Sequence, residues 1–259
     1  MNILDKIAEV KRAEVEAMKS IVPERSLKVE AFSVLRSVLS MSGALRRHTP
    51  GVIAEHKRRS PSKGEIAPMS DVAAVAASYA LNGAAAMSVL TDTPYFGGSA
   101  TDLALARRTV PTLPILRKEF IVDEYQIYES RIMGADAVLL IAAILDSAKL
   151  ERFNYIAHSL GLETLIEVHT LEEISMVPEG ADMVGINNRD LTSFSTDISN
   201  CTRLIEALPE GAVKVAESGI RNVEDVARLR DVGFDGFLIG EALMSKTDPG
   251  EALRAMTGI

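Results

Sequence analysis

A lysine at the end of a short apolar run is the first residue in this sequence whose position suggests chemistry. Lys118 closes the run PILRK, and a helix-like stretch and a second apolar run follow it up to Leu145. Because side chains alternate along a strand, Leu116, Lys118 and Phe120 are expected on one face. A charge among buried apolar side chains is costly unless it is paired. The pattern indicates either proton transfer at the strand end or a structural ion pair.

Acidic, basic and amide side chains end other apolar runs in the same way. Glu55 and Lys57 are two residues apart, so they share a strand face, and Glu167 is in phase with His169. Such groups act as general acids and bases when they converge on one site, although each alone could equally form a salt bridge. The strand-end residues are Glu55, Lys57, Lys118, Glu167, Asn187, Asn188, Arg189, Glu217, Ser218, Gly219, Gly240 and Glu241.

Two glycine turns near the C-terminus are suited to binding an anion. The runs AESGI and LIGEAL place Gly219 and Gly240 between an apolar run and a helical run. Glycine lets backbone N–H groups approach a phosphate, and the N-terminus of a following helix favours negative charge. Glycine is also common as plain turn chemistry, but two such turns after consecutive strands favour a phosphate site. Glu241 would repel the anion unless its carboxylate points away.

The elements that must position these residues follow a regular alternation. From Gly51 onward, short apolar runs alternate with longer amphipathic runs, the pattern of strand–helix units. Four segments repeat one design, in which a glycine precedes an apolar strand, at Gly83, Gly134, Gly180 and Gly233. We therefore expect an α/β fold, a single (β/α)8 TIM barrel. Its expected strands are 52–57, 85–91, 115–120, 137–142, 163–169, 183–187, 213–218 and 236–239.

A barrel would bring the strand-end residues together, because the carboxyl ends of its eight strands surround one mouth. The rival fold is a doubly wound open sheet. That fold would bind a dinucleotide through a G-x-G-x-x-G turn after the first strand, and the sequence lacks this turn. We predict one domain, with residues 49–259 in the barrel and 1–48 in an N-terminal helical extension.

The extension is expected to contain two helices and a loop. The first helix carries an apolar stripe that includes Ile3 and Ile7 and ends by Pro23, the second covers 29–39, and 41–50 is a loop. A complete barrel needs no extension to close it. We therefore expect the extension to lie across the catalytic end and narrow the mouth; the alternative is a plug at the opposite end.

Composition excludes several classes of function. The net charge of −8 argues against nucleic acid or an anionic membrane as the main partner. Cys201 is the only cysteine, so neither an intramolecular disulfide nor a cysteine metal site is possible, and the histidines show no paired metal-binding spacing. The sequence shows neither a signal peptide nor a membrane segment. We expect a cytoplasmic protein that binds no metal, as a monomer or weak homodimer.

Two loops complete the expected mouth. RRSPSKGEIAP follows the first strand and carries Arg58, Arg59 and Lys63, which either close over an anionic substrate or remain solvated. TPYFGGS follows the second strand and carries Tyr95 and Phe96. An aromatic side chain in a mouth loop suits a flat ring, although packing against a neighbouring loop is the commoner role.

Together these motifs resemble the indole-3-glycerol phosphate synthase family over nearly the whole chain. AEHKRRSPSKG is similar to the family's E-x-K-x-x-SPS segment, and the later family motifs follow in order as LTDTPYFGGS, PILRKEFIVDEYQIYE, GADAVLLI, IEVH, GINNRDL, VAESGI and LIGEALM. Two residues depart from the family. His56 stands where an apolar residue is commoner, on a face expected to point outward and hydrogen-bond in the core. Glu241 stands where some relatives have serine.

The resemblance implies a reaction that closes the ring of 1-(2-carboxyphenylamino)-1-deoxyribulose 5-phosphate. The products are indole-3-glycerol phosphate, carbon dioxide and water, and neither a metal nor an organic cofactor is implied. Lys118 matches the family's general acid for ring closure, and Glu167 matches the group that serves later proton transfers. Either Lys57 or Lys118 would drive dehydration. Glu55 and Asn187 match residues that orient the lysines and hydroxyls.

The resemblance also implies where this phosphorylated small molecule would be held. Its phosphate would meet the backbone at Gly219, Gly240 and Glu241. Its flat ring would lie against Phe96, Phe120 and Leu191, and its carboxylate near Lys57 and Arg189. The remaining substrate contacts would be Ser60 of the SPS run and, near the sugar, Glu217 and Ser218.

Two alternative functions deserve comparison. Phosphoribosylanthranilate isomerase, another phosphate-handling barrel, is expected to use a cysteine–aspartate pair, yet Cys201 lies outside the strand ends. A non-catalytic barrel that binds a phosphorylated metabolite would keep the glycine turns. It would have no need of Lys118 and Glu167 in the mouth.

Overall fold

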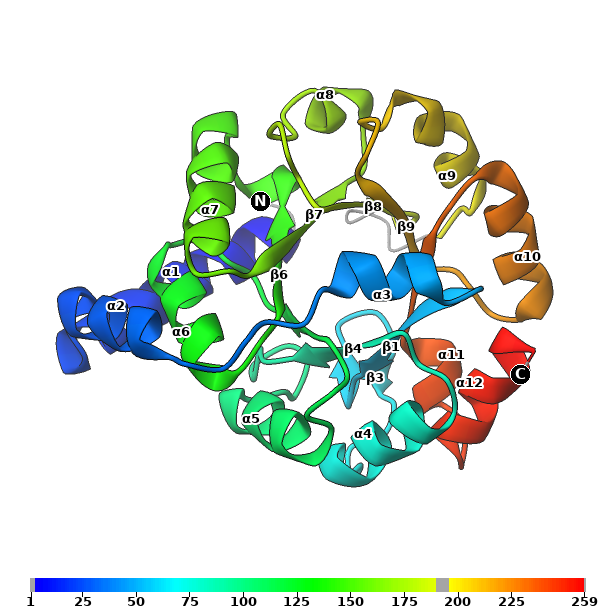
Figure 1. Ribbon diagram of the computed structural model, residues 1–259, viewed down its shortest axis with the longest axis horizontal. Coiled ribbons are helices and arrows are strands. Elements are labelled where there is room, and N and C mark those ends of the chain that lie inside the picture. The colour runs from blue at the N-terminus through cyan, green and yellow to red at the C-terminus, as the bar shows by residue number, and fades with distance from the viewer. Residues whose placement is uncertain (1–2, 190–195, 259) are drawn as a thin grey trace.

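The computed structural model describes residues 3–189 and 196–258, in which parallel strands close into a barrel surrounded by helices (Figure 1). The neighbour order around the barrel is β1-β10-β9-β8-β7-β6-β5-β4, and β4 pairs with β1 to close it. The prediction of a TIM barrel is therefore confirmed. The strands are β1 (Gly51–His56), β4 (Ala86–Leu90), β5 (Ile115–Lys118), β6 (Ala137–Ile141), β7 (Glu163–Val168), β8 (Met183–Asn187), β9 (Val213–Glu217) and β10 (Gly236–Ile239).

All eight expected strands are present, and the differences lie at their ends. The predicted ranges run too far at their carboxyl ends, past the last strand residues, at Lys57, Thr91, Phe120, Ala142, His169 and Ser218. Side-chain alternation continues past the point where the backbone ladder stops, so a pattern alone does not mark the strand end. Lys57, Phe120 and His169 keep the strand phase, so their side chains still face the mouth or the carboxylates beside it.

The inward side chains fill the barrel with apolar layers and place charges above them. Val213 and Val215 of β9 precede Glu217, and Leu165 of β7 precedes Glu167 in the same phase. The interior is thus a packed core rather than a pore. Its buried apolar residues are Leu4, Met41, Leu45, Ile53, Ala85, Ala86, Leu116, Ala137, Leu139, Ile141, Leu165, Met183, Val213, Val215 and Leu238.

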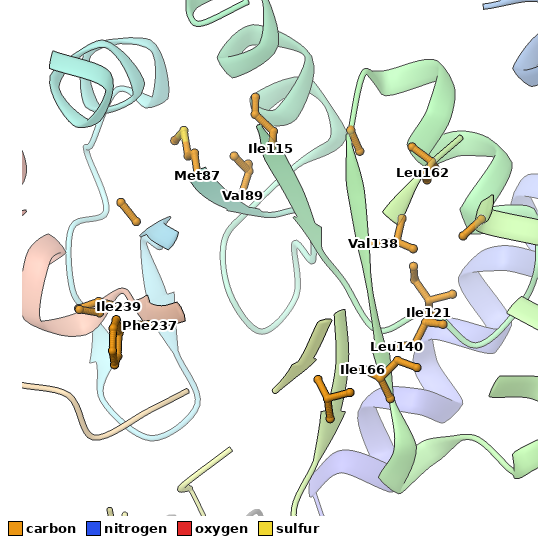
Figure 2. Packing of buried hydrophobic residues seen from close by; sticks show 14 of the residues in the cluster. Met87, Val89, Ile115, Ile121, Val138, Leu140, Leu162, Ile166, Phe237 and Ile239 are labelled. Carbon is orange, nitrogen blue, oxygen red and sulfur yellow. The ribbon is translucent and has the colours of Figure 1, made fainter. Parts of the chain in front are cut away.

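The outward side chains of the strands pack against the surrounding helices (Figure 2). Val138 and Leu140 alternate with the inward Leu139 along β6, so both faces of that strand are buried. Burial of both faces explains why the strands read as continuous apolar runs. The outer helices are α4 (Val72–Leu81), α5 (Ala100–Thr109), α6 (Tyr125–Met133), α7 (Ser147–Ser159), α8 (Leu171–Ile174), α9 (Ser199–Leu204), α10 (Val223–Val232), α11 (Glu241–Met244) and α12 (Pro249–Thr257), with short 3-10 turns η1 (Ala142–Ile144) and η2 (Ile205–Ala207).

His56 occupies one outward position, as predicted. It is 2% exposed, and its Nε2 lies 3.0 Å from Ser70 Oγ. Burial, with the nearby positive charge of Arg58, lowers the pKa of His56 to about 4. The residue is therefore a neutral, hydrogen-bonded histidine of the outer core.

The extension forms three helices, α1 (Ile3–Ile21), α2 (Glu24–Ser33) and α3 (Met41–Arg47). The end of α1 before Pro23 is confirmed. The predicted second helix is present, but its predicted bounds of 29–39 are wrong, because α2 begins at Glu24 and the backbone becomes extended from Val34. The predicted loop over 41–50 is also wrong, because 41–47 is helical. That helix has only seven residues, too few to show a periodicity, and its stability comes from the cap that Ser40 provides to Gly43 N.

These helices cover both ends of the barrel. Ile3, Leu4 and Ile7 of α1 line the cavity at the mouth, where we expected the extension. Leu45 of α3 packs at the opposite end, against Gly51 and Gly236 at the starts of β1 and β10. In Figure 1, α3 crosses the barrel, whereas α1 and α2 lie beside α6. Both alternatives for the extension therefore occur, on different helices.

A two-stranded antiparallel sheet, β2 (Arg59–Ser60) and β3 (Gly64–Glu65), orders the loop after β1. Its pairing turns the segment SPSK towards the mouth, where Ser60, Ser62 and Lys63 line the cavity.

Among the residues that the structure describes, no helix has the length and apolar character needed to cross a membrane.

Candidate active site

A cavity of about 790 Å³ opens at the carboxyl ends of the strands. Leu191 lies outside the described residues, and every other predicted site residue lines this cavity. These residues are Glu55, Lys57, Ser60, Phe96, Lys118, Phe120, Glu167, Asn187, Arg189, Glu217, Ser218, Gly219, Gly240 and Glu241. The strand phases therefore bring together residues that are far apart in the sequence.

Lys118 lies between two buried carboxylates. Its Nζ is 3.2 Å from Glu167 Oε2 and 3.3 Å from Glu217 Oε2. The carboxylate side chains are 4% and 1% exposed, respectively. Lys118 is thus paired and also faces the cavity, so the two interpretations of its position, ion pair and proton transfer, are compatible.

Burial and charge act in opposite directions on this cluster. Burial alone would lower the pKa of Lys118, but the carboxylates of Glu217, Glu167 and Glu55 outweigh it and raise the pKa. Burial would raise the pKa of Glu167, but Lys118 and His169 lower it. For Glu217 burial prevails, and the neighbouring charge of Glu167 adds to it, so its pKa is raised despite Lys118. Lys118 is therefore a protonated lysine whose two carboxylate partners differ in proton affinity.

A second lysine–carboxylate pair lies beside the first. Lys57 Nζ is 2.7 Å from Glu55 Oε1, as expected for residues that share a strand face. Burial would raise the pKa of Glu55, but Lys57 and Lys118 outweigh it and lower the pKa. Glu55 thus carries a negative charge that faces both lysines.

Two successive asparagines at the end of β8 order the groups around them. Asn187 donates a hydrogen bond from Nδ2 to Glu167 Oε1 at 2.9 Å, leaving the other oxygen to Lys118. Asn188 donates from Nδ2 to the carbonyl oxygens of Glu217 and Ser218, each at 3.1 Å. The first asparagine orients a side chain and the second holds the turn that follows β9.

That turn has an unusual backbone. Ser218 has φ 65° and Gly219 has φ 79°, so two successive residues adopt the left-handed region. A side chain at position 219 would also contact Thr196, 2.6 Å from its Cβ. Glycine is required there, and the strained serine beside it is typical of functional turns.

Glu241 is paired with cations from two other loops. Its carboxylate lies 3.2 Å from Lys63 Nζ and 3.5 Å from Arg189 Nη2. Arg189 also donates a hydrogen bond to Ser62 Oγ. The repulsion that Glu241 would exert on a bound anion is therefore offset by two positive charges.

Of Arg58, Arg59 and Lys63 in the loop after β1, Lys63 is the one that lines the cavity. Arg58 instead binds Asp102 of α5, at 2.6 Å, and the carbonyl of Gly97. Arg59 donates to the carbonyls of Thr93 and Pro94. Both arginines thus bind the loop after β1 to the loop after β4.

One wall of the cavity is aromatic and apolar. The rings of Phe96 and Phe120 are 5.9 Å apart between centroids and tilted by 39°. They come from the loops after β4 and β5, and Leu90 and Ile141 of the barrel line the same cavity. Aromatic pairs at this separation attract each other, so the two loops form one surface.

Three features of the site escaped sequence reasoning. Gly185 lies inside β8 because a Cβ atom there would overlap Glu217 Oε1, and an isolated glycine within a strand is the signal of such a close approach. His169 lies 3.5 Å from Glu167 Oε1 and 3.2 Å from Glu173 Oε2. Lys11, the third, is 6% exposed, and its position between Ile7 and Val15 on the apolar stripe of α1 is the signal that could have found it.

Cys201 lies on α9 and is fully buried in the outer core. Burial raises the pKa of its thiol to about 12. A neutral thiol packed behind the barrel wall is unsuited to the cysteine acid–base chemistry of the alternative isomerase.

A model of the indole-3-glycerol phosphate synthase family matches residues 4–256 of this chain. The chain belongs to this family. It is 47% identical to the indole-3-glycerol phosphate synthase of Bacteroides thetaiotaomicron, over 98% of this chain and 96% of that protein. It is 46% identical to the enzyme of the same name from Carboxydothermus hydrogenoformans, over 98% of each chain. The family match includes the strands that carry the cavity residues.

Solved structures with low sequence identity share the barrel. Thiamine phosphate pyrophosphorylase from Pyrococcus furiosus superposes with a TM-score of 0.61 and 17% identity, covering 85% of this chain and 96% of that one. 3-Hexulose-6-phosphate synthase from Salmonella typhimurium gives 0.64 and 14%, covering 80% and 97%. These similarities concern the fold alone.

Proposed function

We propose that this member of the family is a carboxy-lyase that converts 1-(2-carboxyphenylamino)-1-deoxyribulose 5-phosphate into indole-3-glycerol phosphate. In the reaction, the ring carbon that bears the carboxylate attacks the ketone carbon of the sugar. Carbon dioxide and then water are lost, and the indole ring results. The observation that carries the proposal is the convergence of two lysines and three carboxylates in one cavity, with an aromatic wall beside them.

Lys118 is proposed as the general acid of ring closure. As the aromatic carbon attacks, the ketone oxygen gains negative charge and needs a proton. Lys118 holds its proton in the resting site, since three carboxylates raise its pKa. A substrate that separates the ammonium group from Glu167 and Glu217 would weaken that stabilisation and favour proton transfer.

Glu167 is proposed to serve the dehydration. After carbon dioxide leaves, the new hydroxyl departs as water and the neighbouring carbon loses a proton. Glu167 is ionised, because Lys118 and His169 lower its pKa, and Asn187 fixes its orientation. It can therefore take part as a base, while Lys57 or Lys118 protonates the leaving hydroxyl.

The substrate is proposed to bind along the length of the cavity. Its phosphate meets the backbone N–H groups of the turns at Ser218–Gly219 and Gly240–Glu241, where Lys63 adds positive charge. Its ring lies against the wall that Phe96 and Phe120 form. Its carboxylate faces Lys57 and Arg189, and Ser60 and Glu217 contact the remaining polar groups.

Turnover can be tested directly. The purified protein is given the carboxyphenylamino sugar phosphate, and the fluorescence of the indole product is followed. The chain contains no tryptophan, so the protein contributes little background. A protein that binds the substrate and forms no indole product would favour the non-catalytic alternative.

We further propose that residues 1–48 and the barrel form one cooperative domain in the cytoplasm, as a monomer or weak homodimer. Support comes from α1 and α3, which contribute Leu4 and Leu45 to the core inside the barrel. A single unfolding transition and a molar mass near 27.9 kDa in dilute solution are expected. Two separate transitions would contradict the single domain.

A further inference from the structure

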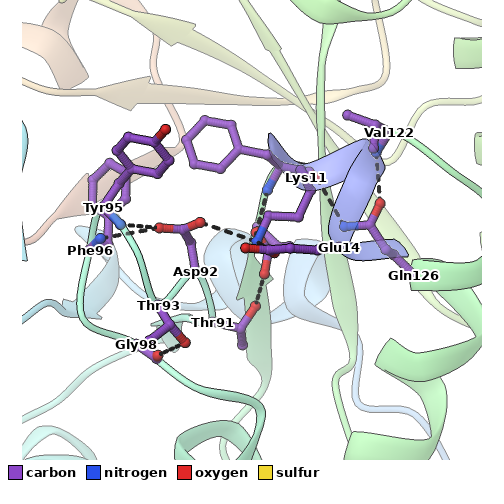
Figure 3. A network of polar contacts seen from close by, with 12 residues as sticks. Lys11, Glu14, Thr91, Asp92, Thr93, Tyr95, Phe96, Gly98, Val122 and Gln126 are labelled. Atoms are coloured by element: carbon purple, nitrogen blue, oxygen red, sulfur yellow. Dashed lines mark hydrogen bonds and ion pairs between the residues drawn. The ribbon is translucent and has the colours of Figure 1, made fainter. Parts of the chain in front are cut away.

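A buried lysine of the extension joins the two loops that carry the aromatic wall. Lys11 lies on the buried stripe of α1, one helical turn beyond Ile7, which lines the cavity. Its Nζ is 3.1 Å from Asp92 Oδ1 (Figure 3). The same atom is 3.3 Å from Glu119 Oε1. Asp92 is 0% exposed and Glu119 is 4% exposed. The side chain therefore leaves the helix surface and ends among buried carboxylates.

Each of these carboxylates holds the backbone next to one aromatic ring. Asp92 Oδ2 accepts hydrogen bonds from Tyr95 N at 2.8 Å and from Phe96 N at 3.2 Å. Glu119 Oε1 accepts from Phe120 N at 2.9 Å. The positions of Phe96 and Phe120 thus depend on two carboxylates that share one cation.

Lys11 is the main positive charge that balances this pair. Asp92 Oδ1 is buried, and among the described residues it has no hydrogen-bond partner besides its ion pair with Lys11. Glu119 has a second cation, Arg117, at 3.8 Å. Burial alone would lower the pKa of Lys11, but Glu119, Glu14 and Asp92 raise it, so the lysine remains charged. Without it, two buried carboxylates would face each other with little compensation.

We propose that Lys11 is a positioning residue for the aryl group of the substrate, holding Phe96 and Phe120 as one wall through Asp92 and Glu119. This inference rests on the proposed placement of the substrate ring against those two phenylalanines. The N-terminal extension thereby has a specific role in substrate binding. α1 sets the shape of the ring site from outside the barrel, in addition to covering the mouth.

The test is Lys11→Met, which keeps the length of the side chain and removes its charge. The matched control is Lys19→Met on the same helix, because Lys19 forms a 2.7 Å ion pair with Asp123 away from the cavity. We expect Lys11→Met to raise KM by roughly tenfold or more, since losing the partner of a buried charge is strongly destabilising. Lys19→Met should leave KM unchanged.

The binding of two substrate fragments distinguishes a positioning role of Lys11 from general damage to the site. Two competitive inhibitors are measured, anthranilate as the aryl fragment and inorganic phosphate as the other end of the substrate. Lys11→Met should weaken anthranilate by roughly tenfold and leave phosphate unchanged, whereas Lys11→Arg should restore anthranilate binding in large part. If Lys11→Met does not fold, Lys11→Gln, whose amide can still donate to Asp92, is judged by the same criteria.

Two results would overturn the inference. One is an unchanged KM and anthranilate affinity together with a lower thermal midpoint, which would make Lys11 a structural residue only. The other is an equal loss of affinity for anthranilate and for phosphate in Lys11→Met. Phe96→Ala distinguishes the underlying proposal: if it leaves anthranilate binding intact, the ring placement fails and the inference with it. If Phe96→Ala weakens anthranilate binding but Lys11→Met does not, only the role of Lys11 is overturned.

Discussion

The carboxylate of Glu55 occupies the space that a side chain on residue 240 would need. A Cβ atom on Gly240 would overlap Glu55 Oε1, and the same oxygen lies 2.7 Å from Lys57 Nζ. Gly240 was predicted as a phosphate-binding glycine. Its closeness to Glu55 provides a second reason for glycine, because the backbone at the end of β10 forms one wall of the lysine–carboxylate pair.

Gly240→Ala should therefore damage catalysis as well as phosphate binding. We expect Glu55 to shift, Lys57 to lose its orientation and kcat to fall by about 10²-fold, the scale of a misplaced catalytic group. Gly219→Ala is the comparison, because it strains the other phosphate turn and does not touch the lysines. It should mainly raise KM. A Gly240→Ala enzyme with normal kcat and raised KM would show that Gly240 serves the phosphate alone.

Lys118→Met should abolish most of the activity. The change keeps the stem and removes the proton that ring closure needs, so kcat should fall by about 10²–10⁴-fold. Glu167→Gln, which keeps the hydrogen bond from Asn187 possible, should lower kcat more than substrate affinity. Both are checked by steady-state kinetics on proteins whose folding is confirmed by thermal unfolding. A Lys118→Met enzyme retaining more than about a tenth of wild-type kcat would contradict the role.

The sequence predicted the barrel and most of the site because both depend on short periodic patterns. Side-chain alternation predicted that Glu55 and Lys57 share one strand face, as do Leu116 and Lys118. The register of the eight parallel strands then brings these side chains together at the mouth. The network around Lys11 depends on tertiary packing instead. Helical phase puts Lys11 on the apolar stripe of α1 with Ile7 and Val15, but its partners Asp92 and Glu119 are far away in the sequence and no pattern identifies them. The helix α3 was missed because its seven residues are too few to show a periodicity.

His169 should make folding stability depend on pH. Burial would lower its pKa, but Glu173 and Glu167 outweigh burial and raise it above the usual value of 6.5. A raised pKa in the folded state means that the stabilisation is fully present below pH 6.5 and is lost as pH rises through the folded pKa. The wild type should therefore exceed His169→Gln in unfolding free energy by more at pH 6 than at pH 9. Denaturant titrations at both pH values measure the two differences.

The charged groups around His169 provide the control for this effect. Glu173 Oε2 is its nearest acceptor, and Glu167 of β7 and Glu217 of β9 contribute from the cavity side. In a Glu173→Gln background, the pH dependence that His169 confers should shrink, since one of the charges that raise its pKa is gone. If the Glu173→Gln change left the stability difference between proteins with and without His169→Gln unaltered at both pH values, His169 would act through packing rather than through its charge.

Leu4 and Leu45 offer a matched pair that separates the two ends of the barrel. Both are buried leucines of the same inner core, but Leu4 of α1 lines the cavity whereas Leu45 of α3 packs against Gly51 and Gly236 at the opposite end. Leu45→Ala should reduce the unfolding free energy by about 2–5 kcal/mol, the usual cost of such a cavity, and leave KM unchanged. Leu4→Ala should raise KM, with a smaller loss of stability because the vacated space adjoins the open mouth. Denaturant unfolding and steady-state kinetics on the two variants test this division. If Leu45→Ala raised KM as much as Leu4→Ala, the two ends would be coupled through the core, and the extension would act as one unit.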